Sequence, residues 1–146
     1  MKDLIELRML SAIRELLAKR VNELLLDLEF NIPLIESGDY SSAYTIAPAI
    51  ALSTCESTEK ERLILLDAYT LTITLDLQNV PESDLYCYAY SAAIYKALVE
   101  DPTLGGIAEK VTVTNKKYTP PKNPICGEGW GITLTLRITV EAPNAC

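Results

Sequence analysis

Two long segments of the sequence alternate apolar and polar residues with a period of two. Residues 68–77 alternate apolar or aromatic side chains with threonines and Asp76. Residues 131–141 alternate isoleucine, leucine and valine with threonine, Arg137 and Glu141. Successive side chains of a β-strand point to opposite faces of a sheet, so each segment predicts a strand with one buried face. The other face is rich in threonine, and we expect it to be wet or covered by a partner.

The remaining extended segments are shorter. Residues 107–115 predict a strand with Val111 and Val113 facing inward. Residues 28–35 and 44–52 are also extended, but each contains a proline, which cannot donate to a ladder and restricts a segment to an edge strand or an extended arm. The polar residues 53–62 are expected to be a connection that leads into the strand at residues 68–77.

Two helices are expected. Residues 2–20 form an amphipathic pattern in which apolar residues recur every three or four positions, from Leu10 onward. Residues 24–26 could be the last turn of this helix or the approach to a strand. The second helix spans residues 82–100, opened by Pro81 and ended before Pro102. One side of this helix carries Cys87, Ser91, Ile94 and Leu98, and another carries Leu85, Ala92, Tyr95 and Val99. Its tyrosines, Tyr86, Tyr88, Tyr90 and Tyr95, are expected to pack at the boundary between helix and sheet with wet hydroxyls.

These segments indicate one α+β domain. A chain of 146 residues is near the usual size of a single domain, so we assign residues 1–146 to one unit. Two α-helices packed on one face of a mainly antiparallel sheet, of about four to five strands, bury all the predicted apolar faces.

Residues 116–129 differ from the strands around them. They contain Pro120, Pro121 and Pro124 and few apolar anchors, and they are long for a hairpin connection. We expect this loop to be mobile in the free subunit and ordered by a neighbour, and we expect residues 142–146 to be a tail.

The composition bears on catalysis. The chain contains no histidine, so Ser-His-Asp triads, Cys-His pairs and H-E-x-x-H metal sites are excluded. No phosphate-binding loop is present, and the carboxylate pairs lie at turns or helix ends, where caps and solvated charges are common. We therefore expect no enzyme activity, no catalytic residues, no cofactor and no metal site.

The cysteines and the N-terminal residues indicate in which cellular compartment the protein is expected. Cys55, Cys87, Cys126 and Cys146 are far apart and form no zinc-ligand or redox spacing. Charges occupy the N-terminal residues where a signal peptide would be apolar, and no stretch has the roughly 18 apolar residues that span a membrane. We expect a cytosolic protein with reduced thiols and no membrane partner.

Net charge limits the contacts with nucleic acid. Lys and Arg number 13 against 20 Asp and Glu, giving a net charge of −7. Affinity for nucleic acid comes from clustered basic side chains that neutralise phosphates, and the lysines of residues 110–122 are few and interrupted. Tight binding to DNA is not expected.

One segment carries a family resemblance. Residues 100–113 read EDPTLGGIAEKVTV, in which Pro102 stops a helix and Gly105 and Gly106 permit positive φ angles that lead into a strand. In this setting the sequence resembles the phage tail-completion, or tail-terminator, proteins, which carry a "dPtLgG" turn after the second helix. The likeness extends over most of the chain, from the N-terminal helix to the strand at residues 131–141.

The resemblance implies a structural role in virion assembly. Such a protein caps the completed tail tube as a ring, commonly hexameric, stops tube polymerisation and offers the surface that joins the head. Its partners would be other copies of itself, the tail-tube protein and the head-tail connector protein, with DNA passing through the ring. It would be found in the host cytoplasm during assembly of the phage or prophage, then at the head-proximal end of the tail.

Two groups of residues are candidates for interfaces in such a ring. The polar strand face contributes Thr72, Thr74, Thr135 and Arg137. The predicted loop and the strand entry after it contribute Lys116, Lys117, Tyr118, Lys122 and Trp130.

Two other functions stay open from the sequence. A head-tail connector or neck protein of the same particle would share the small size, the ring assembly and the lack of catalysis. A small ligand-binding domain, using the tyrosine-rich helix and the sheet as a pocket, belongs to a different class.

Overall fold

The computed structural model of the protein describes residues 4–27, 34–35, 45–46, 48–61, 64–78, 83–122 and 128–143. The helical elements are α1 (Ile5–Leu16), a π-helical turn η1 (Leu17–Val21), α2 (Asn22–Leu26) and α3 (Ser83–Glu100). The strands are β1 (Leu34–Ile35), β2 (Thr45–Ile46), β3 (Ala49–Glu61), β4 (Ile64–Gln78), β5 (Lys110–Thr119) and β6 (Glu128–Pro143). None of the helices in these ranges has the length and apolarity that crossing a bilayer requires.

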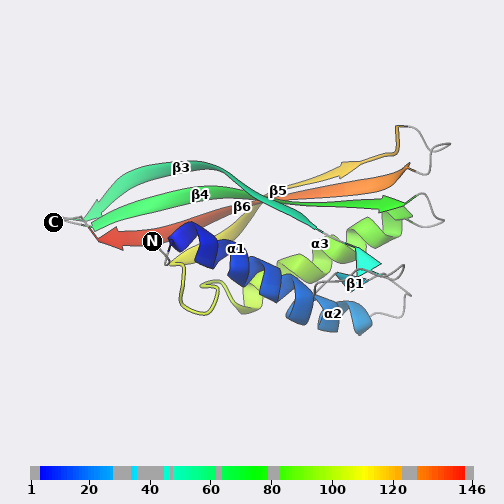
Figure 1. Ribbon diagram of the computed structural model, residues 1–146, viewed down its shortest axis with the longest axis horizontal. Helices are drawn as coiled ribbons and strands as arrows, with labels where there is room; N and C mark the ends of the chain where they lie inside the picture. The colour runs from blue at the N-terminus through cyan, green and yellow to red at the C-terminus, as the bar shows by residue number, and fades with distance from the viewer. Residues whose placement is uncertain are drawn as a thin grey trace.

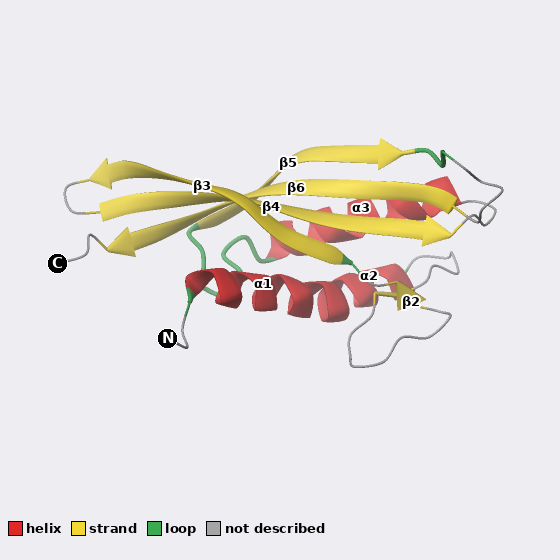
Figure 2. Cartoon of the chain, turned by 45° about the horizontal axis from the view of Figure 1, so that its top comes forward, coloured by secondary structure: helices red, strands yellow, loops and turns green. Residues whose placement is uncertain are grey.

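The main sheet has four antiparallel strands in the order β3-β4-β6-β5. The helices lie along one face of this sheet, and the described helices leave the other face open (Figures 1 and 2). A separate pair of short parallel strands, β1 and β2, lies beside the helices. The predicted α+β fold, with two helices packed against a mainly antiparallel sheet, is confirmed.

The two strands with strict alternation form the centre of the sheet. In the register of β4 and β6, Leu71 lies opposite Leu136 and Ile73 lies opposite Leu134, and all four side chains are buried. The helix-facing residues of both strands belong to one continuous core with α1, η1, α2 and α3. The predicted inward faces of residues 68–77 and 131–141 are confirmed at every apolar alternate position from Tyr69 to Leu77 and from Ile132 to Val140.

The prediction of a connection at residues 53–62 is wrong. Strand β3 continues through this segment to Glu61 and pairs with β4 along its whole length. Cys55, Glu56 and Ser57 are exposed, because this part of β3 is an edge strand. An exposed edge strand needs no apolar face, so residues 53–61 lack the alternation of apolar and polar residues that usually indicates a strand.

Strand β5 also differs from its prediction. It begins at Lys110 and continues to Thr119, so Lys116 to Thr119 belong to a strand and the connection to β6 is shorter than the predicted loop at 116–129. The register shifts between Val113 and Asn115, where Thr114 donates a hydrogen bond from Oγ1 to the carbonyl of Thr135 at 3.2 Å. This bulge shifts the alternation by one residue and hides the second half of the strand from a periodicity search. Residues 123–127 lie outside the described residues, as does the end of the predicted tail.

The N-terminal helix includes residues 24–26 as its last turn. The helical backbone runs without interruption from Ile5 to Leu26, through the π-helical turn η1. A π turn takes in one extra residue, and here it keeps Leu17, Val21 and Leu24 all on the buried side.

Asn22 joins this long helix to β1. Its amide nitrogen Nδ2 donates to the carbonyl oxygen of Ile35 at 2.9 Å, and its Oδ1 accepts from the backbone amide of Ile35 at 2.8 Å. Nδ2 also donates to the carbonyl of Ala18 at 2.9 Å. One side chain therefore satisfies both backbone groups of the buried Ile35. A buried backbone group without a hydrogen bond would destabilise the fold.

Of the two sides distinguished on helix α3, the one that carries Cys87 is the buried side. Cys87, Ser91, Ile94 and Leu98 are all buried, and burial raises the pKa of the Cys87 thiol to about 11. Tyr90 is fully buried too, so the expectation of a wet hydroxyl is wrong for that residue, because it lies on the core side of the helix. Tyr88 and Tyr95 are 47% and 48% exposed, as expected for tyrosines at the boundary.

The central core should be sensitive to truncation. Ile73→Ala and Leu136→Ala each remove a fully buried side chain and leave a cavity, so each should lower the free energy of unfolding by about 2 to 5 kcal/mol. Urea unfolding followed by circular dichroism measures this loss. Thr72→Ala, on the opposite face of the same strand, is the matched control and should cost far less. Losses below about 0.5 kcal/mol at both core positions would contradict the assignment of the buried face.

Candidate interaction surfaces

The open face of the sheet brings together four of the predicted interface residues. We call this surface the outer face. It is made by Thr70, Thr72, Thr74 and Asp76 of β4 with Thr133, Thr135, Arg137 and Thr139 of β6. Thr72 lies directly opposite Thr135, and Arg137 lies opposite Thr70. Thr72, Thr74, Thr135 and Arg137 therefore form one continuous patch at the middle of the sheet.

The chemistry of the outer face is amphipathic. Its threonines are half-buried by one another, while Asp76 and Arg137 are exposed. Each threonine presents both a methyl group and a hydroxyl, so the surface tolerates water and can also form a polar protein interface.

The bulge in β5 divides the predicted lysine and tyrosine group between two faces. Lys117 lies opposite Thr133, at the margin of the outer face. Lys116 and Tyr118 lie opposite Leu134 and Ile132, which places them on the helix side of the sheet. The structure thus separates neighbours that the sequence had grouped.

Lys116 and Tyr118 contact two exposed tyrosines of α3. The ammonium of Lys116 lies 4.8 Å from the centroid of the Tyr95 ring, within the range of a cation–π contact. The rings of Tyr118 and Tyr88 meet edge to face, with centroids 5.2 Å apart. These four side chains close the junction of α3 and β5, which we call the α3–β5 seam.

The seam continues as an apolar stripe along α3. Tyr88, Ala92, Tyr95 and Val99 are all exposed and recur at helical spacing. Beside the stripe, a cavity of 250 Å³ is lined by Tyr95 and Val99 of α3 and by residues 110–113 of β5, among others. Sequence reasoning noted that Ala92, Tyr95 and Val99 share one side of the helix, but the partners of that side depended on the bulge.

The other two predicted interface residues lie apart from the seam. Trp130 of β6 is half-buried and packs against the hydrophobic core. Lys122 is exposed and follows the end of β5.

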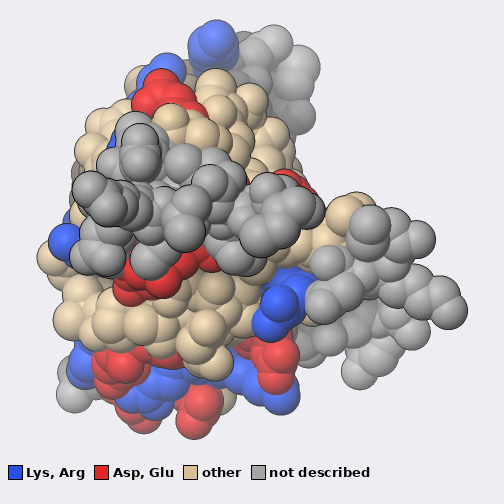
Figure 3. Space-filling model, turned by 90° about the vertical axis from the view of Figure 1, so that its left-hand side faces the viewer, with Lys and Arg blue, Asp and Glu red and all other residues tan. Residues whose placement is uncertain are grey.

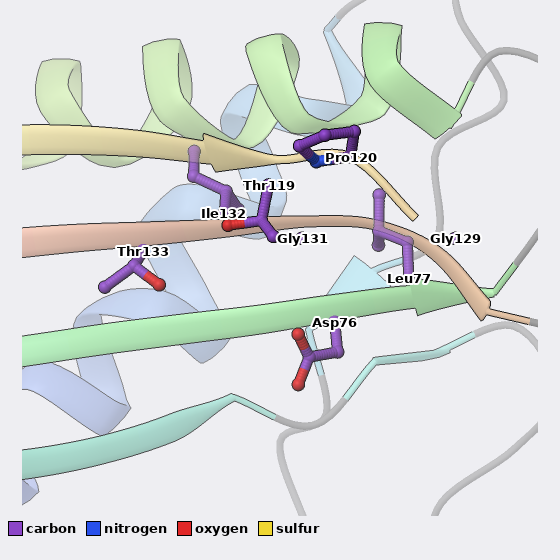
Figure 4. A pocket seen from close by; sticks show the side chains of 8 residues that line it. All are labelled: Asp76, Leu77, Thr119, Pro120, Gly129, Gly131, Ile132 and Thr133. Atoms are coloured by element: carbon purple, nitrogen blue, oxygen red, sulfur yellow. The ribbon is translucent and has the colours of Figure 1, made fainter. Parts of the chain in front are cut away.

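A cavity of 420 Å³ lies where β4 and β5 end and β6 begins (Figure 4). Asp76 and Thr119 flank Gly131, and a Cβ at Gly131 would come within 2.9 Å of Oδ1 of Asp76. Gly131 therefore lets the Asp76 carboxylate lie close to the backbone of β6. Asp76 is the only ionisable side chain among the described residues that line this cavity. Among the described lining residues, Asp76 has the hydroxyls of Thr119 and Thr133 near it but no second acid or base, so these residues form no acid–base pair.

Charges of both signs are mixed over the helical side of the molecule. Figure 3 views the end that lies at the left of Figure 1, and acidic and basic side chains alternate along its lower side, where the helices lie. Lys19 and Glu15 form one such pair at 2.8 Å. Within the described ranges, no group of three or more cysteine, aspartate or glutamate side chains is placed to hold a metal ion.

The turn after α3 has the predicted geometry. The helix ends at Glu100, and Gly105 and Gly106 have φ angles of 69° and 93°. Their amides are held by side chains of the same turn, since Gly105 N donates to Oδ1 of Asp101 at 3.0 Å and Gly106 N donates to Oγ1 of Thr103 at 3.2 Å. Pro102 contributes its carbonyl, which accepts from the amide of Val111 at 2.8 Å and so ties the turn to β5. Positive φ favours glycine at these positions.

The left-handed backbone of Leu104 in this turn was not predicted. Its φ angle is 51°, although it is not a glycine, and its side chain is buried. Burial of that side chain offsets the backbone cost of the left-handed conformation.

An ion pair fixes the helices next to this turn. The guanidinium of Arg20 donates from Nε to Oε1 of Glu100 at 2.7 Å and from Nη2 to Oε2 at 2.9 Å. The hydrogen bond from Arg20 holds the pKa of Glu100 below its ordinary value, and the same bond raises the pKa of Arg20. The pair joins residues that are 80 positions apart, at the end of η1 and the end of α3.

The comparisons with known proteins give no assignment: no protein-family profile matches this chain, and no curated protein matches it significantly.

The Arg20–Glu100 pair predicts a dependence of stability on pH. The folded-state pKa of Glu100 lies below the ordinary 4.5, so the pair's contribution is present above that pH and is lost as the pH falls through the lowered value. Glu100→Gln should therefore be less stable than the native chain at about pH 7, and the two should converge as the pH falls below the lowered pKa of Glu100. Urea unfolding at neutral and at acidic pH measures the difference.

Glu56→Gln serves as the control for this test, since Glu56 is exposed on β3. It should follow the native chain at both pH values. A deficit of Glu100→Gln that persists unchanged in acid would show that the pair does not act through the charge of Glu100.

Proposed function

We propose that this chain is a structural subunit of phage assembly, of the tail-terminator class. Copies of it would form a ring at the head-proximal end of the tail tube, stop the tube from growing and present the surface to which the head joins. This role depends on the geometry of the contacts between subunits and involves no covalent reaction.

The observation that carries the proposal is the sheet that is covered on one face only. In the described part of the chain, the helices pack against one face and leave the outer face open, while the edge strands β3 and β5 each pair with a strand on one side only. A ring subunit requires one surface that lines the bore or contacts the tail tube and two surfaces that join the neighbouring subunits. A subunit with a solvated sheet face and two lateral strand edges has these three surfaces. The half-buried threonines suit an interface that forms from soluble subunits.

The turn at residues 101–106 supports the same assignment. This is the segment in which the sequence resembles the tail-terminator proteins, and it leads directly from α3 into the edge strand β5. Its glycines and the carbonyl of Pro102 fix where β5 starts, so the turn positions one of the two lateral edges.

The charge of the chain is compatible with the passage of DNA. A net charge of −7 on each copy gives the ring an acidic character, which opposes retention of the phosphate backbone. DNA could then pass through the ring without being held.

The role can be tested in the phage or prophage that encodes the chain. Deleting its gene should give tails of unregulated length and heads that lack tails, because growth of the tube is no longer capped. Electron microscopy of purified particles measures tail length and head joining. In complemented particles, gold label directed to the protein should sit at the head-proximal end of the tube.

The same experiment separates the alternatives. Label on the portal of tailless heads would assign the chain to the head-tail connector and contradict the terminator role. Normal particles after deletion would reject a role in assembly altogether. A ligand that raises the melting temperature of the isolated protein in a thermal-shift screen would then favour the small ligand-binding domain.

A further inference from the structure

The outer face of the sheet is divided by charge into two halves. The β5–β6 half consists of the outward positions where these two strands pair, and it holds Lys110, Thr112, Asn115, Lys117 and Thr119 of β5 with Gly131, Thr133, Thr135, Arg137 and Thr139 of β6. This half contains three cations and no carboxylate. The outward carboxylates of Asp76 and Glu56 lie on β4 and β3, and Glu141 lies on β6 beyond the start of β5.

The three cations of the β5–β6 half are exposed. We call Lys110, Lys117 and Arg137 the basic track. None of the three forms an ion pair with another described residue, whereas Lys19 on the helical side is paired with Glu15. A subunit with a net charge of −7 therefore keeps three unneutralised cations together on one face.

The basic track is long enough to follow a phosphate backbone. Lys110 is level with Thr139 and Lys117 is level with Thr133, which sets the two lysines about 20 Å apart along the strands. Arg137 lies between these levels on the neighbouring strand. One strand of duplex DNA carries a phosphate at about every 3.4 Å of the helix axis, so each cation can reach a different phosphate of one backbone.

The other side chains of this half favour a duplex over other polyanions. Single-stranded nucleic acid is held largely by bases that stack on aromatic side chains, and a membrane surface is held by apolar side chains beside the cations. None of the described outward residues of this half is aromatic, because the register places Tyr118 on the helix side. Threonine and asparagine side chains, which surround the cations here, are common donors to phosphate oxygens.

We propose that the basic track is a weak, sequence-independent contact site for the phosphate backbone of duplex DNA. The inference deepens the proposed function and rests on it in one respect: the ring brings duplex DNA in front of the outer face, which would line the bore. The net negative charge of each subunit keeps the affinity low. The passing DNA would then make transient contacts with the track without being held.

Fluorescence anisotropy of a labelled DNA duplex of random sequence, titrated with the full chain from low to physiological salt, provides the test. The duplex should bind at low salt. The logarithm of the association constant should fall against the logarithm of the salt concentration with a slope no steeper than about −3, because the track neutralises at most three phosphates.

Variants of the track separate its cations from the charge of the whole chain. Lys117→Gln and Arg137→Gln should each reduce the magnitude of the salt slope by about 1. Lys117→Glu/Arg137→Glu should weaken binding by about tenfold or more at low salt. Arg14→Glu/Lys96→Glu changes the net charge by the same amount on exposed positions of α1 and α3, and should weaken binding much less. Circular dichroism and thermal melting should show native folding for every variant, since all four positions are exposed.

Three results would overturn the proposal: no binding of the duplex at low salt, track variants that bind as the native chain does, or a control variant that loses as much affinity as the track variant. Tighter binding of single-stranded DNA or of phosphatidylserine vesicles than of the duplex would also overturn it and would assign the track to that ligand.

Failure of this inference is distinct from failure of the proposed function. If labelled protein caps tail tubes while the track variants bind DNA normally, only the DNA contact is rejected. If the track behaves as expected but the protein is not found on particles, only the phage role is rejected.

Discussion

The pairing of β4 with β6 is the interaction on which the rest of the structure depends. The two strands are antiparallel partners from Ile64 opposite Pro143 to Gln78 opposite Glu128, and they hold the centre of the sheet. Their helix-facing residues form the surface on which both helical segments pack. A slip of one residue would turn this whole apolar set towards the outer face, so the alternation of the two sequences specifies the register strongly. The edge strands then attach on either side, and each exposes one free edge.

Where a local pattern coincided with burial, the sequence predicted the fold well. Leu71, Ile73, Leu134 and Leu136 are buried as their alternation predicted, and α3 ends where Pro102 required. The failures have physical causes. Residues 53–61 form a strand without a periodic signal, because an exposed edge strand can be polar on both faces. The sequence predicts a loop for the second half of β5, because a bulge at Thr114 shifts the alternation by one residue.

The candidate surfaces were predictable to different degrees. Thr72 and Thr135 could be placed on one face from periodicity, and the register brings them side by side. The contact of Lys116 with Tyr95 could not be predicted, because it depends on the bulge that turns Lys116 towards the helices.

The central claim is that the subunit joins its neighbours through two different strand edges. Hydrogen exchange measured by mass spectrometry, on dilute monomer and on the concentrated, associated protein, tests it most directly. Association should slow exchange of the backbone amides of both β3 and β5, to the same extent, because every head-to-tail contact uses one of each. Amides of β4 and β6, which are already paired, should change little. Protection of β5 alone or of β3 alone would indicate a two-fold contact, and protection of neither would place the interface elsewhere; either result would contradict the account.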